Sequence, residues 1–292
     1  MPEDNPPVVV GVDGSEGAIA AARWAGVIAA QLRTGLHIVH ALPSIGRNLA
    51  ESAAAIAAAA MSYQDDAVAI LLREATDAVR ADHPALLIST EALDIPVDKA
   101  LIEASRSARL VVLGGDGLIP AVALLVGSTT LSVATHACCP VVVWRGGQMP
   151  DDDRAVVVGF DFTPAARSAL ENAFMVAECL GAPLRVVYSW PTRTPAAPVS
   201  IPFLIDWEAL EAAEWSRLAD TVNRANKRHP GVSAEFRIEA VSPAKALLGR
   251  SADAQLLVVG TRGRNTVASA LLGSTSMNLL QHSRIPIMIC RP

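Results

Sequence analysis

Two loops with widely spaced glycines carry the residue types that bind phosphate groups. The spacing Gly-x2-Gly-x9-Gly-Ser-Thr occurs twice, as Gly114, Gly117, Gly127, Ser128 and Thr129, and as Gly260, Gly263, Gly273, Ser274 and Thr275. Glycines at a strand end let backbone N–H groups approach an anion closely, and the start of a helix adds free N–H donors and the positive end of its dipole. Ordinary turns and N-caps would use the same residues. The recurrence of one long spacing favours phosphate binding.

An aspartate follows the first apolar run of each half of the chain. Asp13 ends the sequence Val-Val-Val-Gly-Val-Asp, and Asp161 ends Val-Val-Val-Gly-Phe-Asp. A carboxylate beside a strand end can accept a hydrogen bond from a nucleoside hydroxyl or lie near a metal ion. The alternative for both residues is an Asx turn or an N-cap before the next helix.

The two glycine-spaced loops differ in charge. The second contains Arg262 and Arg264, and either guanidinium could bind a phosphate through paired hydrogen bonds, or both could be solvated. The first has Asp116 and Leu118 at the corresponding positions. A carboxylate about 4 Å from a phosphate would repel it by roughly 4 kcal/mol at an effective dielectric constant near 20. Rotation of Asp116 away from the phosphate, or a bridging Mg²⁺, would remove most of this repulsion.

The sequence lacks the motifs of an efficient hydrolase. It contains no Ser-His-Asp set, no HExxH or HxGH motif and no Gly-Lys-Ser/Thr loop, and Lys99, Lys227 and Lys245 all fall outside the glycine-spaced loops. His136 and His282 fall within predicted helices, and we interpret them as packing residues rather than bases. Without a positioned base or lysine, rapid hydrolysis of a bound nucleotide is not expected.

The elements that must position these residues are repeated along the chain. Three pairs of residues share an offset of 146, namely Gly114 and Gly260, Gly127 and Gly273, and Pro140 and Pro286. Asp13 and Asp161 are 148 residues apart, so the copies differ there by a short insertion. Such constant offsets predict a tandem duplication. We expect domains at residues 1–146 and 155–292, joined by the polar, turn-rich linker 147–154.

Each copy alternates short, apolar, β-branched runs with helical patterns. Strands are predicted over 8–13, 36–42, 86–93, 109–114 and 140–145, and over 155–160, 183–189, 232–240, 255–260 and 286–290. Helices are predicted over about 16–33, 60–81, 96–107 and 128–137, and over about 164–180, 206–228, 242–252 and 274–283. This order indicates two tandem α/β domains with doubly wound parallel sheets. The ligand of such a sheet binds beyond the carboxyl ends of its strands, where the strand order reverses.

Composition limits the class of protein. The chain has 292 residues, of which 51% are hydrophobic, and a net charge of −5. A mildly acidic chain is not a general nucleic-acid binder. The N-terminus lacks the pattern of a signal peptide, and the longest low-polarity stretch, residues 49–61, is too short to span a bilayer. Its four cysteines are expected to be reduced and mostly buried. We expect a soluble, cytoplasmic protein that binds neither membranes nor nucleic acid.

Three features together resemble the universal stress protein family. They are the glycine spacing after the fourth strand, Gly-Val-Asp-Gly-Ser after the first strand, and the ending His136-Ala-Cys-Cys-Pro-Val-Val-Val. The resemblance covers nearly the whole chain, once per copy, and is strongest to the tandem two-domain members found in actinobacteria. It implies, for each copy, a Rossmann-like five-stranded parallel sheet with helices on both faces. It also implies ATP at the strand ends, with or without Mg²⁺, and pairing through the last strand.

Carried over by position, the resemblance implies that Asp13 and Asp161 lie beside the adenosine half of ATP, and that Ala41 and Ser189 approach the base. The first expected site comprises Gly11, Val12, Asp13, Ser15, Ala41, Gly114, Gly117, Gly127, Ser128 and Thr129. The second comprises Gly159, Phe160, Asp161, Thr163, Ser189, Gly260, Arg262, Gly263, Arg264, Gly273, Ser274 and Thr275. Phe162, which stands where the first copy has Gly14, is expected to alter the adenosine side of the second site.

These features predict an ATP-binding regulator of a stress response with two nucleotide sites and at most slow ATP hydrolysis. A slow ATPase or nucleotidyl-transfer enzyme, and an interaction scaffold with degenerate sites, are the alternatives. The last strands, 140–145 and 286–290, could pair with each other to give a compact pseudo-dimeric monomer, with dimers forming through other surfaces. A homodimer is the alternative. The sequence does not identify a protein partner.

Because Arg262 and Arg264 lie in the second loop, we expect the second site to bind phosphate more tightly than the first. ATP titrated into Gly117→Ala and Gly263→Ala variants should reveal a larger loss of affinity for Gly263→Ala. Equal losses in the two variants would contradict this expectation.

Overall fold

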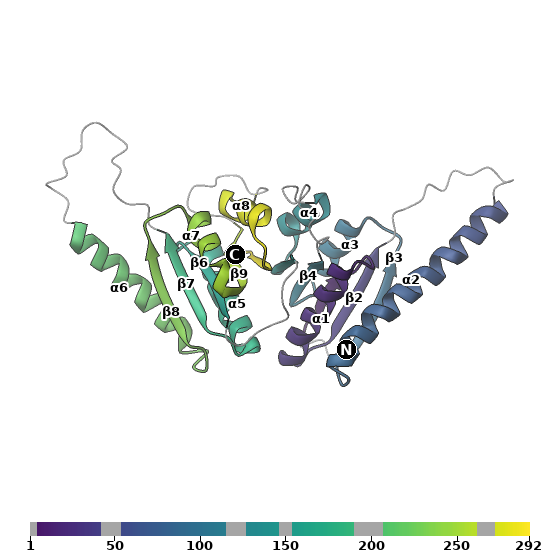
Figure 1. Cartoon of the computed structure of the whole chain (residues 1–292), viewed down its shortest axis with the longest axis horizontal. Coiled ribbons are helices and arrows are strands. Elements are labelled where there is room, and N and C mark those ends of the chain that lie inside the picture. The colour runs from purple at the N-terminus through teal and green to yellow at the C-terminus, as the bar shows by residue number, and fades with distance from the viewer. Residues whose placement is uncertain (1–4, 42–53, 115–126, 146–153, 190–206, 262–271) are drawn as a thin grey trace, which may run out of the picture.

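The computed structural model describes residues 5–41, 54–114, 127–145, 154–189, 207–261 and 272–292, with backbone alone for 54–64 and 207–208 (Figure 1). The first half consists of β1 (Val8–Gly11), α1 (Glu16–Gln31), β2 (Leu36–Ala41), α2 (Ala54–Asp82), β3 (Ile88–Leu93), α3 (Val97–Ala104), β4 (Leu110–Gly114), α4 (Ser128–His136) and β5 (Val141–Trp144). The second consists of β6 (Ala155–Phe160), α5 (Pro164–Leu180), β7 (Leu184–Ser189), α6 (Trp207–Asn226), β8 (Ala234–Glu239), α7 (Pro243–Gly249), β9 (Ala254–Gly260), α8 (Ser274–His282) and β10 (Ile287–Cys290). A short 3-10 helix, Ser251–Asp253, precedes β9. The tandem α/β order predicted from the sequence is confirmed.

The largest difference from the predicted elements is at the start of α2. The helix begins at Ala54, whereas the sequence pattern predicted a start near residue 60. The added turns are almost entirely alanine, which has the highest helix propensity of all residues, so the helix extends without an apolar face to mark it.

The ten strands in the described parts of the chain form one sheet, in the order β3-β2-β1-β4-β5-β10-β9-β6-β7-β8. Within each half the neighbouring strands are parallel. β5 and β10 are antiparallel, with Val142 opposite Met288. Each half is therefore a five-stranded, doubly wound parallel sheet, as expected. The last strands pair with each other inside the chain, which is one of the two arrangements that the sequence left open.

Two apolar layers cover the two faces of the sheet. One joins α1, α2, α5 and α6 to one face, and the other joins α3, α4, α7 and α8 to the opposite face. The strand residues alternate between the layers, so that Val8 and Val10 lie in the first and Val9 in the second. Each layer contains residues of both halves, so the two halves share their hydrophobic core.

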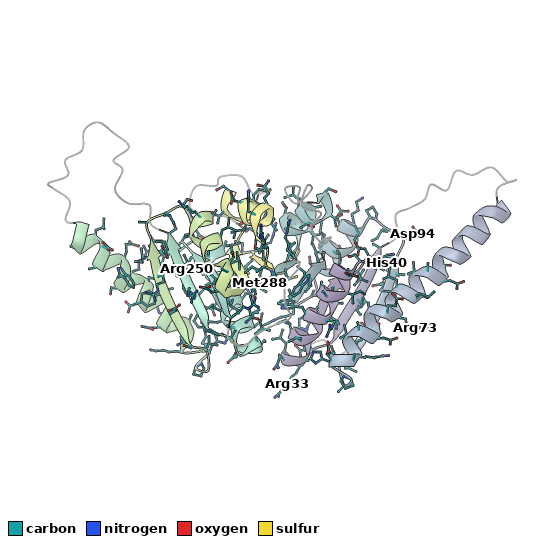
Figure 2. All side chains as sticks on the ribbon, in the orientation of Figure 1. Arg33, His40, Arg73, Asp94, Arg250 and Met288 are labelled. Atoms are coloured by element: carbon teal, nitrogen blue, oxygen red, sulfur yellow. The ribbon has the colours of Figure 1, made fainter. Side chains whose placement is uncertain are left out.

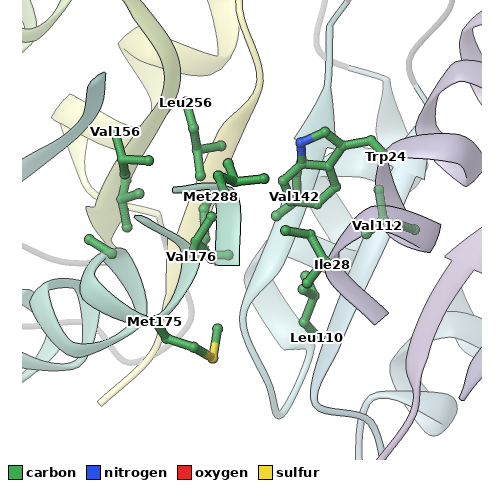
Figure 3. Close-up of a cluster of buried hydrophobic side chains, with 14 of the residues drawn as sticks. Trp24, Ile28, Leu110, Val112, Val142, Val156, Met175, Val176, Leu256 and Met288 are labelled. Carbon is green, nitrogen blue, oxygen red and sulfur yellow. The ribbon is translucent and has the colours of Figure 1, made fainter. Parts of the chain in front are cut away.

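The core is continuous where the halves meet (Figure 3). Val142 and Met288, from the two paired strands, are fully buried beside Trp24 of α1. The rings of Trp24 and Trp144 pack with their centroids 6.0 Å apart. In the same apolar layer, Met175 of α5 accepts a hydrogen bond from the Arg109 guanidinium at 3.2 Å. The two tryptophans both belong to the first half, whereas the pairing of Val142 with Met288 and the hydrogen bond from Arg109 to Met175 tie the first half to the second.

No helix in the described parts of the chain is both long enough and apolar enough to cross a membrane.

A charge placed at the junction should destabilise both halves. Val142→Asp would bury a carboxylate with no partner, and we expect it to lower the free energy of unfolding by about 3 kcal/mol or more. Ile70→Asp is the control because Ile70 lies 57% exposed on α2, and it should change stability by less than about 1 kcal/mol. Urea denaturation followed by tryptophan fluorescence measures both. Equal stability of the two variants would show that the junction is not part of the folded core.

Candidate functional site

The ends of β1 and β4 mark the place where the strand order reverses in the first half. β2 lies beyond β1, and β5 lies beyond β4, so the chain moves in opposite directions from this pair. β6 and β9 are the equivalent pair in the second half. The predicted site residues that the structure describes gather at these carboxyl ends, which is the edge where doubly wound sheets bind ligands.

Asp13 and Asp161 both form the Asx turn that was the alternative to a ligand role. The Asp13 carboxylate accepts a hydrogen bond from the Ser15 N–H at 2.9 Å. The Asp161 carboxylate accepts from the Thr163 N–H at 3.1 Å and from its hydroxyl at 2.6 Å. In each case Oδ1 makes these bonds, and Oδ2 accepts none from any described residue. Each aspartate thus sets a turn with one oxygen and keeps the other available.

Ser15 and Thr163 are the N-caps of α1 and α5. Their hydroxyls accept hydrogen bonds from the N–H groups of Ala18 at 3.1 Å and Ala166 at 3.2 Å. This capping satisfies one of the free donors at the start of each helix. The hydroxyls are therefore used by the fold itself, although they stand beside the aspartates.

α4 and α8 begin without such a cap. Their N-cap residues are Gly127 and Gly273, and neither helix start has a side-chain cap from the described residues. Ser128 and Ser274 are the first helical residues, so the alternative that these serines are ordinary N-caps is wrong. The first N–H groups of both helices are left as donors, and the positive end of each helix dipole lies there.

The start of α8 is fixed against the end of β9 by hydrogen bonds. The Gly273 N–H donates to the Thr261 carbonyl at 2.7 Å, and the Ser276 hydroxyl donates to the Gly260 carbonyl at 2.9 Å. The Thr261 N–H in turn donates to the Cys290 carbonyl at 2.8 Å. The two ends of the second glycine-spaced loop are therefore held beside each other.

The physical reason for a glycine differs from one position of the site to another. A Cβ on Gly114 would lie 2.5 Å from the Ala18 Cα, and one on Gly260 would lie 2.8 Å from the Ala165 carbonyl carbon. These two glycines are required because α1 and α5 cross the strand ends at close range. A Cβ on Gly127 would have its nearest neighbour, the Thr130 hydroxyl, at 3.8 Å, and its φ of −55° suits any residue. Neither packing nor backbone conformation among the described residues explains the glycine at 127.

Gly11 and Gly159 lie two residues before the aspartates of the Asx turns. A Cβ on Gly11 would approach Leu101 of α3 at 3.0 Å, and one on Gly159 would approach Leu247 of α7 at 2.9 Å. Val12 and Phe160, the next residues, face the opposite layer and are buried. These four residues position the strand ends through packing.

Phe162 adopts a left-handed backbone with φ of 67°, as Gly14 does in the first half with φ of 86°. Its ring packs edge-on against Phe160 and Tyr188, with centroids 4.9 and 5.2 Å away. The Arg217 guanidinium of α6 covers the ring at 3.8 Å. The side chain is thus directed to the α6 layer, away from Gly159 on the α7 side. Its predicted effect on the adenosine side remains a prediction.

The ends of the second strands differ between the halves. Ser189 is buried, and its hydroxyl donates to the Val241 carbonyl. Ala41 offers only a methyl group at the same position. His40, the residue before Ala41 in the sequence (labelled in Figure 2), donates from Nδ1 to the Val12 carbonyl at 2.7 Å and so ties β2 to the segment after β1. The sequence analysis did not identify His40, because its partner is a backbone atom.

Several predicted residues lie outside the described residues. They are Gly117, Arg262, Gly263 and Arg264, together with Asp116 and Leu118.

The interpretation of His136 and His282 as packing residues is wrong. Each is exposed and is the last residue of its helix, with Nδ1 bonded to the carbonyl four residues earlier at 2.9 Å. Both helices stop there because a proline follows closely, and proline cannot continue a helix.

Two arginines at the same edge were missed by the sequence analysis. Arg145 directly follows β5 and Arg291 directly follows β10, and they share the 146-residue offset of the glycines. Burial lowers the pKa of Arg145 below its usual value. The repeat offset could have revealed this pair from the sequence.

Burial keeps two of the four cysteines, Cys139 and Cys179, in the protonated form. All four are free thiols, and burial raises the pKa of Cys139 to about 12 and that of Cys179 to about 11. Such thiols stay protonated and unreactive at neutral pH. Among the residues that the structure describes, no group of three or more His, Cys, Asp or Glu side chains could hold a metal ion.

Comparisons with known proteins give similarity over the full length. A model of the universal stress protein family matches residues 5–145 and again 154–291. A universal stress protein of Mycolicibacterium smegmatis is 31% identical over 290 residues, which cover 98% of this chain and 97% of that protein. The crystal structure of a universal stress protein from Archaeoglobus fulgidus covers 99% of both chains, with a TM-score of 0.69 at 18% identity. A universal stress protein in complex with cAMP matches 47% of this chain and 94% of its own, at 28% identity and a TM-score of 0.36.

Alanine at the two kinds of glycine should have different effects on folding. Gly114→Ala would force α1 away from the end of β4, and we expect a loss of about 2 kcal/mol or more. Gly127→Ala has open space and should cost less than about 1 kcal/mol. Urea denaturation of both variants tests the difference. Equal costs would mean that Gly127 is also a packing glycine.

Proposed function

The chain belongs to the universal stress protein family, and on that premise we propose that each half binds one ATP molecule at the carboxyl ends of its strands. The observation that carries this proposal is Gly127. Its missing side chain is needed by neither the backbone nor the packing of the described residues, and it stands directly before the free N–H donors of α4. A ligand that must come within contact distance of the backbone explains a glycine there.

The polarity of the helix start selects an anion. The free N–H groups and the positive dipole end of α4 favour negative charge, and Ser128 and Thr129 add hydroxyl donors beside them. α8 repeats this arrangement after Gly273. The phosphates of ATP, with Mg²⁺ where it bridges them, are the group that these donors fit.

The position of the aspartates selects a nucleoside beyond the phosphates. Oδ1 of Asp13 is used by the Asx turn, so the turn holds Oδ2 at a fixed place beyond the end of β1. A ribose hydroxyl is a donor that this oxygen can accept. Ala41, at the end of the neighbouring strand β2, leaves space for a flat base because its side chain is a single methyl group. Asp161 and the end of β7 take the same roles in the second half.

The proposed role is that of a regulator rather than a catalyst. ATP bound at one thousand times its dissociation constant stabilises a protein by about 4 kcal/mol, which is enough to set its conformation or its choice of partner. Neither glycine-spaced loop contains a lysine or a histidine in its sequence, so we expect phosphoryl transfer to be slow. Residues 1–146 and 155–292 are the two proposed domains, with 147–154 as linker, in a cytoplasmic pseudo-dimeric monomer.

ATP should raise the melting temperature of the wild-type protein, and the proposal predicts which variants lose that effect. In Gly127→Ala, a methyl group would stand between the ligand and the donors of α4, so we expect ATP affinity at the first site to fall at least tenfold. Asp13→Asn keeps the acceptor of the Asx turn but removes the charge, and it should also weaken ATP while leaving stability nearly unchanged. Differential scanning fluorimetry and calorimetric titration measure these effects.

Gly231→Ala is the matched control. A Cβ on Gly231 would meet no atom within 4 Å, and this glycine lies in the turn before β8, at the opposite end of the strands from the site. The variant should bind ATP as the wild type does. Mass spectrometry of the ligand released by denaturing the purified protein would identify the nucleotide directly. Absence of any adenine nucleotide, together with no ATP-dependent shift, would favour the interaction scaffold instead.

Sustained release of phosphate that disappears in Asp13 and Asp161 variants would favour the slow ATPase. The proposed regulator should release phosphate slowly or not at all.

A further inference from the structure

Arg145 stands where the first glycine-spaced loop leaves the sheet. Trp144, the residue before it, pairs with Gly114 in the parallel register of β5 and β4. Arg145 is therefore one position beyond the last strand pair, on the strand next to the loop. Its backbone therefore lies close to Gly114, because neighbouring strands lie about 4.8 Å apart.

Arg145 is a cation without a partner among the described residues. It is half-buried, and burial alone lowers the pKa of its guanidinium. It forms no hydrogen bond or ion pair with any residue that the structure describes. Other partly buried arginines have carboxylate partners, as Arg185 has Glu235 and Arg250 has Glu239. Taking a charge out of water without a partner is costly, so a guanidinium left unpaired by the described residues favours the binding of an anion.

The sheet directs Arg145 toward the start of α4. Val141 and Val143 face the layer that contains Val133 and Ala134 of α4, and side chains alternate along a strand, so residue 145 falls on the same face. α4 returns from β4 to β5, and its N-terminus therefore lies at the edge where β5 ends. A cation beside the positive end of a helix dipole is unfavourable until an anion joins them.

The second half places Arg291 at the equivalent position. Cys290, the residue before it, pairs with Gly260. Arg291 differs from Arg145 because it already takes part in an interaction in the structure. The glycine-spaced loop of the second half also contains Arg262 and Arg264. The first loop contains Asp116 and no arginine. Arg145 is therefore the cation that strand order brings to the first site.

The strand order gives the direction of the bound nucleotide. Ala41 ends β2, Asp13 follows β1, Gly114 ends β4 and Arg145 follows β5, and these strands are neighbours in that order. A nucleotide with its base at β2 and its ribose at Asp13 extends its phosphates toward β4. The terminal phosphates then lie closest to β5.

We propose that Arg145 binds the terminal phosphates of the nucleotide in the first site and makes that site prefer ATP to AMP. This inference rests on the proposed function. A guanidinium can donate two parallel hydrogen bonds to phosphate oxygens, which gives both charge and fixed geometry. AMP, which has only the phosphate next to the ribose, does not reach Arg145.

The test compares Arg145→Met with Arg145→Lys by calorimetric titration of ATP and of AMP into the full chain. In Arg145→Met, ATP affinity at one of the two sites should fall at least tenfold, while AMP affinity changes less than twofold. Arg145→Lys keeps the positive charge but lacks the paired donors of the guanidinium, and it should recover part of the ATP affinity. Arg106→Met is the control for the loss of one positive charge, because Arg106 is exposed and paired with Glu103 at the far end of α3.

Thermal unfolding without ligand separates a ligand role from a structural one. Removal of an unpaired, half-buried charge should keep or raise the melting temperature of Arg145→Met, whereas Arg291→Met loses an existing interaction and should not be stabilised. A lower melting temperature for Arg145→Met, with equal losses for ATP and AMP, would overturn the inference. So would ATP binding by Arg145→Met that matches the wild type. If the wild-type protein binds no adenine nucleotide, the proposed function itself fails.

Discussion

A short antiparallel ladder between β5 and β10 joins the two halves of this protein. Val141 to Val143 pair with Ile287 to Ile289, and both strands are fully buried. A strand this apolar cannot remain at the edge of a sheet in water, because its unpaired backbone groups and its side chains would recruit another strand. Pairing the two last strands removes both edges at once. The outer edges differ accordingly: β3 is largely exposed, and β8 carries Glu235, Arg237 and Glu239.

The two halves differ where helix packs on helix, but both keep a glycine at the end of β4 or β9. Arg23 pairs with Asp82 at 2.8 Å between α1 and α2, and the equivalent pair, Glu171 with Arg228, has its charges exchanged. Such an exchange of charges involves only the two residues of the ion pair and leaves the rest of the fold unchanged. The strand ends are bound by a stricter condition, because α1 and α5 cross Gly114 and Gly260 at a distance that excludes any side chain. The Asx turns and the glycine N-caps are likewise present in both halves.

Side-chain size also differs between the two halves where helices pack against each other. Phe174 of α5 stacks on His229 with ring centroids 5.5 Å apart, whereas the residue of α1 that corresponds to Phe174 is Gly26, and a Cβ there would lie 2.7 Å from Val79 of α2.

The fold could be predicted from the sequence because the patterns that determine its strands and helices lie within short stretches of the chain. Apolar runs of five or six residues, helical patterns between them and a constant offset fix the strands, the helices and the duplication. The pairing of β5 with β10 could not be predicted, because the same ladder satisfies the same residues within one chain or between two. The N-cap alternative for Ser128 and Ser274 stayed open because a helix start cannot be placed to one residue without its backbone angles. His136 and His282 were misinterpreted because the helices end earlier than their patterns do.

Arg145 was missed for a different reason, and this bears on the expected difference between the two sites. Motifs were sought within the loops, but strand order brings in a residue about thirty positions away along the chain. At equal distance, the attraction of Arg145 for a phosphate is as large as the repulsion by Asp116, about 4 kcal/mol at 4 Å and an effective dielectric constant near 20. In the proposed first site, these two terms would offset each other at equal distances from the phosphate. The loop of the second site contains two arginines and no carboxylate, so the tighter phosphate binding that we expect there would come from those arginines rather than from the aspartate of the first loop.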